Sequence, residues 1–457
     1  MSAIPGGLDT ERQPPMTVPL RHFVIGLGFL LVGVVVGTGL VTGTVPGLGT
    51  LAHVHLLLAG WVCITIMGAM TQFVPVWSGT SIHSQRLASV QLTLVTTGLL
   101  GFVLGLLLGE FRWLGPFGIL ILVGFWTFVY NVGRTLATVD GLDVTERHFV
   151  FSLLFFLVLT TFGVLLAVDL ARPILPSLSV SHENLLGAHA TLAVFGAVLT
   201  TVYGALYQLG TMFTQTELHG IDNYLRPIEE VGHPVGVVLL ATGRLVDGVA
   251  VARIGGLLIL VAALSFGLVL ARKLYEMQVE WTPMHSRYTV VTPALVTWAL
   301  LSIPAWLDRP TAREHLFGAS GSIHLLVLGV VGFVVVGTLY HIVPFIIWVH
   351  RYSDLLGFED VPMIDDLYDD RLAATDFVLL LVGTAVIVVS DVGGFGSALT
   401  TVGGISVGLG VVVFTTNVLL VIREHSPHSL DRVVLGSMSP RRERAESDET
   451  MTPDRRP

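Results

Sequence analysis

Long uncharged segments alternate with short charged or turn-rich breaks along most of the chain. The first long uncharged run extends from His22 to Gln85 without any Asp, Glu, Lys or Arg. A helix needs about 20 mostly apolar residues to cross the ~30 Å hydrocarbon core of a bilayer. We therefore predict an all-α integral membrane protein with about twelve transmembrane helices. They lie near residues 22–46, 51–78, 87–109, 113–134, 147–169, 184–212, 229–246, 253–272, 288–307, 315–348, 373–391 and 396–422.

Two of these segments are less regular than the others. The uncharged part of the seventh, Val231 to Gly243, is 13 residues long. This segment can span only if Arg244 extends its charged end toward the membrane surface. The tenth segment is unusually long, and we expect it to begin with a stretch that lies along the interface.

Basic residues are distributed unevenly between the two sides of the predicted membrane domain. With the N-terminus inside, most of the 24 Lys and Arg residues fall in inner segments. The exceptions are Arg112, Arg172, Arg244, Arg253, Arg309 and Arg313. Cytoplasmic loops normally carry the excess of basic residues. We therefore expect a multi-pass protein of the cell membrane with both termini in the cytoplasm, which requires an even number of spans.

Composition supports a membrane protein and excludes several kinds of site. The chain is 53% apolar and 12% charged, against about 25% charged in soluble domains. Residues 1–20 and 424–457 are rich in Pro, Ser, Arg and Glu, so we predict disordered ends around a membrane domain at 21–423.

A single cysteine, Cys63, excludes an internal disulfide and multi-cysteine metal sites. The net charge is −9, and we expect no nucleic-acid partner. The acidic segment 354–370 is predicted to be a solvated inner loop.

A sequence repeat occurs in the second, sixth and tenth segments. Each copy has a starting residue, a residue fifteen positions later and a residue nineteen positions later. These are His53, Gly68 and Gln72; His189, Gly204 and Gln208; and Ser322, Gly337 and His341. The local sequences MGAMTQFVP, YGALYQLGT and VGTLYHIVP are also similar. Because the copies are four spans apart, we predict three quasi-equivalent arcs of four helices around one centre.

Histidines lie at or near the start of every copy. His53, His55, His189 and His324 are near the beginnings of even-numbered spans, so they share one depth in the outer part of the bilayer. His53 and His55 are ~200° apart around a helix. They therefore face opposite sides and cannot both bind one small metal ion. They are free to face two different partners.

Two explanations fit these histidines. Each imidazole needs a partner in lipid, because an unpaired polar group costs several kcal/mol there. A neighbouring carbonyl or hydroxyl would satisfy each ring. Four histidines at one depth on related helices instead favour iron, and haem is the usual intramembrane case. Small residues such as Gly60 and Gly196 would either leave room for a macrocycle or allow close helix packing.

These motifs resemble subunit I of the heme–copper oxidases. In that family twelve spans form three arcs, and the tenth span carries H-x-H followed by a glycine at +15 and a proline at +22. Here the words AHVHLLLAGWV and MGAMTQFVP on the second span are closest to the tenth span of the cbb3-type branch. HVH followed by VPVWSG also resembles NnrS, a haem-containing relative linked to nitric oxide. The resemblance covers nearly the whole chain as topology, and the three repeats as sequence.

The resemblance implies one low-spin haem b with two axial histidines. His53 occupies the place of the family's low-spin haem ligand on span two. His324 occupies the place of the other low-spin ligand on span ten. His55 is the competing ligand on span two.

The resemblance does not extend to a complete binuclear centre. Ser322 stands where the family has the ligand of its high-spin haem. His189 matches the copper histidine of span six, but Ala193 replaces the usual tyrosine four residues later. His233 is the one histidine available on span seven. Copper or a second haem is therefore not part of the expected set, and His189 and His233 are the residues available for a metal.

Three functions follow as hypotheses. The first is a haem-b protein that transfers electrons or acts on a small gas such as nitric oxide. The second is an oxidoreductase, a divergent terminal oxidase or nitric oxide reductase in which His55, His189 and His233 rebuild a reactive centre. The third is a cofactor-free transporter or structural membrane protein. Because the chain has no cytochrome c motif, electrons would come from a quinol or a redox protein, with other respiratory subunits and membrane lipid as further partners.

Overall fold

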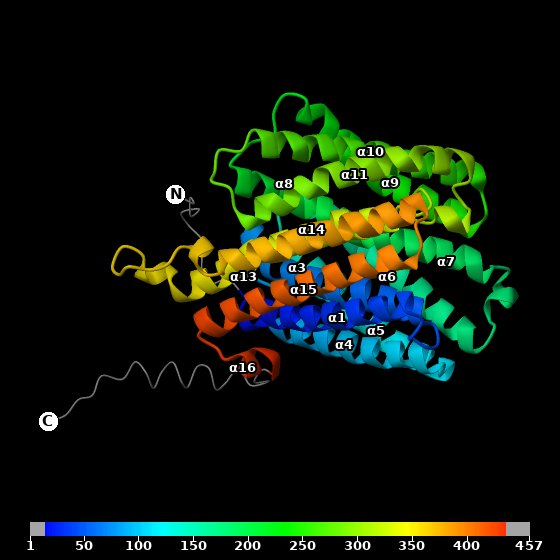
Figure 1. The fold of residues 1–457 in the computed structure, drawn as a ribbon, viewed down its shortest axis with the longest axis horizontal. Coiled ribbons are helices and arrows are strands. Elements are labelled where there is room, and N and C mark those ends of the chain that lie inside the picture. The colour runs from blue at the N-terminus through cyan, green and yellow to red at the C-terminus, as the bar shows by residue number, and fades with distance from the viewer. Residues whose placement is uncertain (1–13, 436–457) are drawn as a thin grey trace.

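The computed structural model describes residues 14–435, which are almost entirely helical (Figure 1). Within this range eleven helices are long and apolar enough to cross a membrane, as expected for a multi-pass all-α membrane protein. They are Thr17–Val41 (α1), Gly49–Trp77, Gln85–Leu108 (α4), Phe111–Leu136, Val144–Ala171 (α6), His182–Thr214, Val249–Tyr275 (α10), Pro283–Asp308 (α11), Ile323–Arg351, Asp370–Gly393 (α14) and Ser397–His425 (α15). The Phe111–Leu136 span consists of a short 3-10 turn followed by α5 (Leu114–Leu136). Each helix coincides with one of the predicted segments.

The seventh predicted segment forms a helix of similar length, α9 (Asp222–Leu245), that is too polar to count among the eleven. Its N-terminal half carries four charged residues. It nevertheless packs along α10 (Figure 1). A Cβ atom on Gly255 of α10 would lie 2.3 Å from the backbone nitrogen of Leu240 in α9. The absence of a side chain at Gly255 is therefore what allows the two backbones to approach so closely.

Arg244, near the end of α9, is satisfied within the protein instead of extending to the membrane surface as predicted, so α9 does not need that extension in order to span. Its side chain is buried, and it donates hydrogen bonds to the carbonyl oxygens of Pro310 and His315. These carbonyls belong to the connection between α11 and the next transmembrane helix, and His315 is the first residue of the tenth predicted segment. That connection contains only a short 3-10 turn, and the transmembrane helix itself starts at Ile323. The long tenth segment therefore does begin with a non-transmembrane stretch.

The three helices that carry the sequence repeat all change to π-helical geometry partway along. The first is α2 (Gly49–Val54), a π segment at His55–Cys63 and α3 (Ile64–Trp77); the second is α7 (His182–Thr191), a π segment at Leu192–Leu199 and α8 (Thr200–Thr214); the third is α12 (Ile323–Leu326), a π segment at Val327–Gly332 and α13 (Phe333–Arg351). Counted from His53, His189 and Ser322, every π segment ends at position +10. The repeat therefore extends from the sequence to the backbone. π segments are rare and occur mostly at functional sites.

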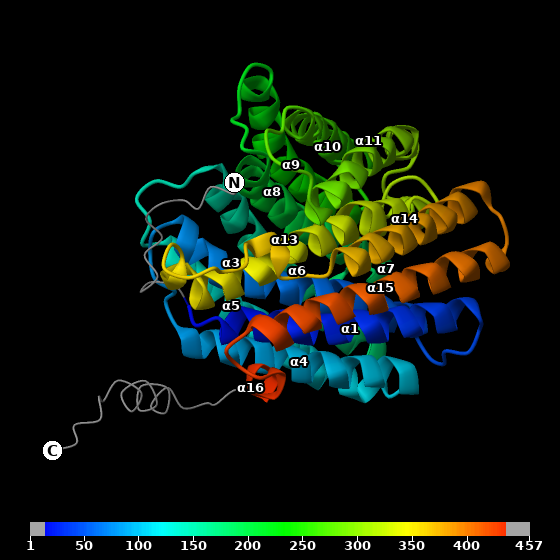
Figure 2. The same ribbon diagram turned by 60° about the vertical axis from the view of Figure 1, so that its left-hand side comes forward.

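The helices pack in the same order three times (Figures 1 and 2). We call residues 17–136, 144–275 and 283–425 units one, two and three. In each unit the first helix packs against the repeat helix: α1 with α3, α6 with α8, and α11 with α13. The remaining two helices form a pair: α4 with α5, α9 with α10, and α14 with α15. The last helix of each unit also contacts the first helix of the next, and α15 contacts α1, so the units close into a ring.

Glycines on the repeat helices contact equivalent residues in units one and two. A Cβ atom on Gly60 would lie 2.7 Å from Cγ of Phe29, and one on Gly196 would lie 2.9 Å from Cγ of Phe155. Both glycines are seven positions after the starting residue of their repeat. Of the two explanations for these small residues, the structure supports close helix packing.

The chain enters and leaves the described helical bundle at the same end (Figure 1). At this end Arg21 Nε of α1 donates a hydrogen bond to the carbonyl of Val433, 2.8 Å away, in the short helix α16 (Leu430–Leu435). We call it the terminal end. The second helix of each unit starts at the opposite end, which we call the histidine end.

Helices extend a few residues beyond the predicted limits 21–423, and the predicted disordered tail contains the short helix α16. α1 already begins at Thr17, because Pro19 lies in the first turn, where a backbone N–H has no helical partner in any case. α15 continues to His425. The rest of the predicted disordered ends, 1–13 and 436–457, lies outside the described residues.

Candidate functional site

Four histidines lie half-buried at the histidine end, and each has one ring nitrogen anchored. His53 Nδ1 donates to the Gly33 carbonyl at 2.9 Å, and His189 Nδ1 donates to the Leu159 carbonyl at 2.8 Å. The other two, His55 and His324, are anchored through Nδ1 as well: to the Leu51 carbonyl at 2.8 Å and to the Asp391 carboxylate at 2.5 Å. In all four rings Nε2 has no hydrogen-bond partner among the described residues. Each ring thus presents a free nitrogen.

His53 and His189 occupy equivalent surroundings in units one and two. The carbonyl that anchors each ring belongs to the first helix of its own unit. Four residues after that carbonyl stands a glycine, Gly37 or Gly163, against which the ring packs. A Cβ atom on Gly37 would lie 2.5 Å from His53 Cε1, and one on Gly163 would lie 3.1 Å from His189 Cε1. These glycines therefore leave the space that each imidazole occupies.

The four rings form two pairs, each across an interface between units. The imidazoles of His53 and His324 lie close enough for their charges to interact, and so do those of His55 and His189. The structure therefore brings His53 together with the residue expected from the sequence. It also places His55 near His189, two of the three histidines that the second hypothesis assigned to one reactive centre. His53 and His55 face different neighbours, as their spacing on the helix predicted.

The donor chemistry of both pairs fits haem iron. An imidazole that binds a metal through one nitrogen usually donates its other N–H to a carbonyl or carboxylate, which fixes the tautomer and the ring orientation. All four rings have this arrangement. Each of the four rings thus has the donor chemistry of a metal-ligating histidine.

His233 does not lie with these rings. Its Nε2 donates to the carbonyl of Phe195 at 2.9 Å, and its ring packs 4.9 Å from that of Tyr203. Arg244 of the same helix reaches the level of Thr191, and His233 precedes it by eleven residues, or roughly 16 Å along a helix. Among residues 14–435 no group of three His, Cys, Asp or Glu side chains is placed to hold a metal ion. A copper site at His189 and His233 stays a prediction to which these contacts lend no support.

Nearer the terminal end, each unit contains a buried polar triad, a feature that the sequence analysis missed. In unit three the carboxylate of Asp376 in α14 accepts hydrogen bonds from Arg287 in α11 and from Tyr340 in α13. The Arg287 guanidinium also lies 4.5 Å from the centre of the Tyr340 ring. Asp376 is fully buried, although it lies near the start of α14. An ion pair and a phenol thus join three helices of one unit.

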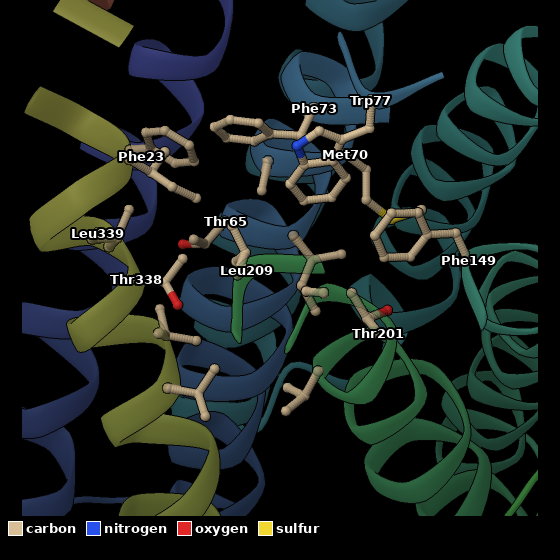
Figure 3. A pocket seen from close by; sticks show the side chains of 17 residues that line it. Phe23, Thr65, Met70, Phe73, Trp77, Phe149, Thr201, Leu209, Thr338 and Leu339 are labelled. Atoms are coloured by element: carbon tan, nitrogen blue, oxygen red, sulfur yellow. The ribbon is translucent and has the colours of Figure 1, made fainter. Parts of the chain in front are cut away.

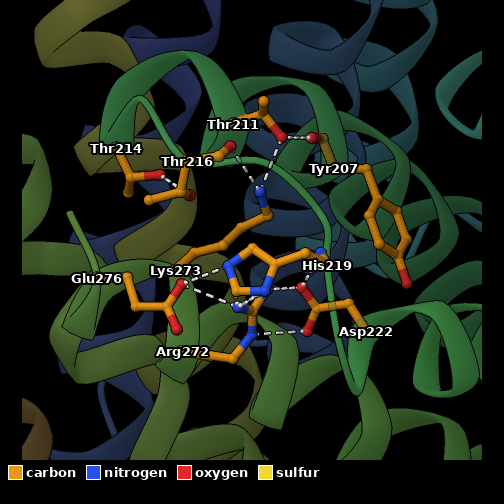
Figure 4. Close-up of polar contacts among 9 residues, drawn as sticks. All are labelled: Tyr207, Thr211, Thr214, Thr216, His219, Asp222, Arg272, Lys273 and Glu276. Atoms are coloured by element: carbon orange, nitrogen blue, oxygen red, sulfur yellow. Dashed lines mark hydrogen bonds and ion pairs between the residues drawn. The ribbon is translucent and has the colours of Figure 1, made fainter. Parts of the chain in front are cut away.

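Unit two carries the corresponding triad with different chemistry. His148 in α6 bonds through Nε2 to the Glu229 carboxylate of α9 at 3.1 Å, and both side chains are fully buried. The Tyr207 ring of α8 lies 5.6 Å from the His148 ring. Beyond this triad, at the terminal end, Lys273 donates to Thr211, and Arg272 pairs with carboxylates beside it (Figure 4).

Unit one has a neutral version of the triad. Gln91 of α4 donates to Thr71 Oγ1 of α3 at 3.5 Å. His22 of α1 anchors Nδ1 on the Val18 carbonyl at 2.8 Å, and its buried Nε2 has no partner among the described residues. The sequence did contain a signal for one member of each triad, the residue on the helix that follows the repeat helix. It stands seven residues before a glycine that packs against the next helix: Gln91 before Gly98, Glu229 before Gly236 and Asp376 before Gly383.

An apolar cavity lies between the three repeat helices (Figure 3). Its volume is about 70 Å³. Equivalent positions of the repeat line it: Thr65, Thr201 and Val334 at +12, and Phe73, Leu209 and Ile342 at +20. The three helices therefore surround a common centre. Its lining offers hydroxyl groups but no charged side chain.

Comparison with known proteins adds no relative. No family model matches the chain, and no curated protein matches it. The likeness to the heme–copper oxidases therefore depends on the sequence motifs, and the site is judged here on its own geometry.

Proposed function

We propose that this chain is a membrane haem protein of the heme–copper oxidase subunit I type, in which His53 and His324 hold a low-spin haem b for electron transfer. One observation carries the proposal. The two rings pair across the interface between units three and one, with Nδ1 of each anchored and Nε2 of each free. This is the arrangement by which imidazoles bind a metal in proteins.

The proposal includes twelve spans in three quasi-equivalent arcs. Eleven crossings would leave the first and last helices at opposite membrane surfaces, yet the hydrogen bond from Arg21 to Val433 joins α1 to the segment that follows α15. This contact supports an even number of crossings, with α9 as the twelfth. The recurring contacts of the three units support the arcs.

The residues around the pair determine what a bound haem would do. A haem held by two histidines has no open coordination position, so it supplies one-electron transfer rather than gas binding. The Gly33 carbonyl and the Asp391 carboxylate hold the two rings in the ligating tautomer. We place the protein in the cell membrane, with a quinol or a redox protein as donor and other respiratory subunits as partners.

The contacts of His233 favour electron transfer over an active oxidase or nitric oxide reductase. A reactive centre would need a ligand set with an open position, built from His55, His189 and His233. The free Nε2 atoms of His55 and His189 lie at the histidine end, whereas Nε2 of His233 is bonded to the Phe195 carbonyl deeper in the bundle. A cofactor-free transporter is distinguished by the absence of a haem spectrum.

The test compares three variants of the purified protein. His53→Ala and His324→Ala should each remove one axial bond of this site and convert its low-spin signal to high-spin, or lose its haem. His350→Ala is the control, because that exposed ring lies at the terminal end on the same repeat helix as His324. If neither His53→Ala nor His324→Ala alters the low-spin spectrum, the proposed site is wrong.

A further inference from the structure

We infer that His55 and His189 form a second bis-histidine haem site, at the interface between units one and two. The inference rests on the proposed function, because it assumes that the His53–His324 pair binds haem. It adds a second cofactor to the single low-spin haem b expected from the sequence. It also gives His189 the role of a haem ligand.

The second pair resembles the first in having each Nδ1 anchored and each Nε2 free, although His55 bonds a carbonyl of its own helix. His55 Nδ1 is anchored on the Leu51 carbonyl and His189 Nδ1 on the Leu159 carbonyl, both at 2.8 Å. Both Nε2 atoms lack a hydrogen-bond partner among residues 14–435. The Phe102 ring lies 5.0 Å from the His55 ring and flanks it on the α4 side. Two half-buried imidazoles with free nitrogens, close enough for their charges to interact, favour a shared ligand, since unpaired polar atoms in a membrane are costly.

Both pairs involve the same two positions of the sequence repeat. In each, the residue at +2 of one repeat meets the residue at 0 of the next repeat around the ring. His324 of unit three meets His53 of unit one, and His55 of unit one meets His189 of unit two. Histidines that each merely bond a carbonyl would not be expected to pair at the same two repeat positions at two separate interfaces.

The third interface shows why there are two sites and not three. There the same rule pairs Thr191 of unit two with Ser322 of unit three. Neither is an imidazole. Arg244 Nη1 donates to Thr191 Oγ1 at 2.6 Å, and Ser322 Oγ donates to the Ala319 carbonyl at 2.7 Å. Both hydroxyls are thus already engaged within the protein, and this interface lacks ligands for iron.

The placement of the two pairs implies electron transfer along the membrane plane. His53 and His55 are on one helix, ~3 Å apart along its axis and on opposite sides of it. Two haems bound there would share one depth and be separated by about one helix, whose diameter is ~10–12 Å. Asp391 gives the first site a carboxylate partner that the second lacks. A carboxylate partner makes the imidazole a stronger donor, so the first haem should have the lower potential and reduce the second.

The test is the number of haems per chain in the purified full-length protein, measured as the pyridine haemochrome against protein concentration. We expect two haems in the unmodified chain, and one after His55→Ala or His189→Ala. One haem should also remain after His53→Ala. None should remain after the double substitution of His53 and His55. A redox titration should show two steps in the unmodified chain and only the lower-potential step after His55→Ala or His189→Ala. His350→Ala should keep both haems.

The outcomes separate this inference from the proposed function. One haem per chain, unchanged by His55→Ala and His189→Ala but lost in His53→Ala, overturns the second site and leaves the first intact. One haem plus one copper, with copper alone lost in His189→Ala, also overturns it. No haem in the unmodified protein overturns the proposed function itself.

Discussion

Asp391 distinguishes His324 from the other three histidines of the site. Backbone carbonyls anchor His53, His55 and His189, whereas a carboxylate anchors His324. A carboxylate partner increases the electron-donating strength of a ligating imidazole and helps to fix its orientation. Nothing in the sequence marks Asp391 for this role. The structure instead gives it direct control over one proposed ligand.

Removing this carboxylate should therefore weaken the first site without unfolding the protein. We expect Asp391→Ala to reduce haem affinity at the His53–His324 site about 10- to 100-fold, the usual effect of losing such a partner. Asp391→Asn should retain the haem, with a raised reduction potential because the negative charge is gone. Haem retention during dilution and a redox titration measure the two effects. Asp308→Asn, an exposed carboxylate at the same end, is the control. Equal behaviour of the two Asp→Asn variants would contradict the assignment.

Gly37 gives a second test at the scale of single atoms. An alanine there would place its Cβ 2.5 Å from His53 Cε1, closer than two carbon atoms can approach, so the ring must turn away. We expect Gly37→Ala to abolish the low-spin signal of the first site. Gly28→Ala, on the same helix with nothing within 4 Å of its Cβ, should leave the spectrum intact. An unchanged spectrum in both variants would show that His53 is not a ligand in this orientation.

Among the helices, the polar triads provide the most specific contacts between elements. Arg287 and Asp376 join α11 to α14 as a fully buried ion pair. Leaving one member of such a pair unpartnered typically costs about 3–5 kcal/mol, whereas replacing both by apolar residues is often neutral. The triads therefore hold the helices of each unit in register near the terminal end, while the histidines occupy the other end.

This difference predicts the behaviour of single and double substitutions. Arg287→Met and Asp376→Leu should each destabilise the protein by about 3–5 kcal/mol, and the double variant should recover most of that loss. Thermal unfolding in detergent measures the effect. Gln91→Leu, at the neutral equivalent position in unit one, should cost less because no charge is left unpaired. A double variant no more stable than the single ones would contradict the pairing.

Hydropathy predicted the spans well, because the length and polarity of a segment depend only on its own residues. The π segments could not be predicted, since their apolar sequences also suit an α-helix. The burial of Asp376 could not be predicted, because proximity to a span end does not reveal a partner on another helix, here Arg287. The pairing of His55 with His189 depends on how neighbouring units meet. The amino-acid sequence gives the spacing of residues along each helix, but not the contact between helices of neighbouring units.

At the scale of the whole molecule, the ring of three units puts the proposed haem layer and the acidic loop at opposite ends. The loop 354–370 follows the last turn of α13, and Trp348 Nε1 donates to the Pro362 carbonyl at 2.8 Å. His324 stands at the other end of the same repeat helix. Replacing Asp365, Asp366, Asp369 and Asp370 by Asn should therefore leave any haem spectrum unchanged. A shifted spectrum would contradict this placement.

The even number of crossings can be tested separately from the cofactor. Gly141 lies between α5 and α6, and Asp308 ends α11. With twelve spans and a cytoplasmic N-terminus, reporters fused at these positions should lie on opposite sides, Gly141 in the cytoplasm and Asp308 outside. Reporters on the same side would show that α9 does not cross.

The central claim is that His53 and His324 complete the coordination of a haem iron. The most direct measurement is the absorption spectrum of the purified protein, oxidised and reduced, with and without carbon monoxide. A bis-histidine haem has no open position. We therefore expect a Soret band and sharp low-spin bands on reduction that carbon monoxide does not shift. A purified, folded chain without a Soret band, or a reduced spectrum that carbon monoxide shifts, would contradict the account.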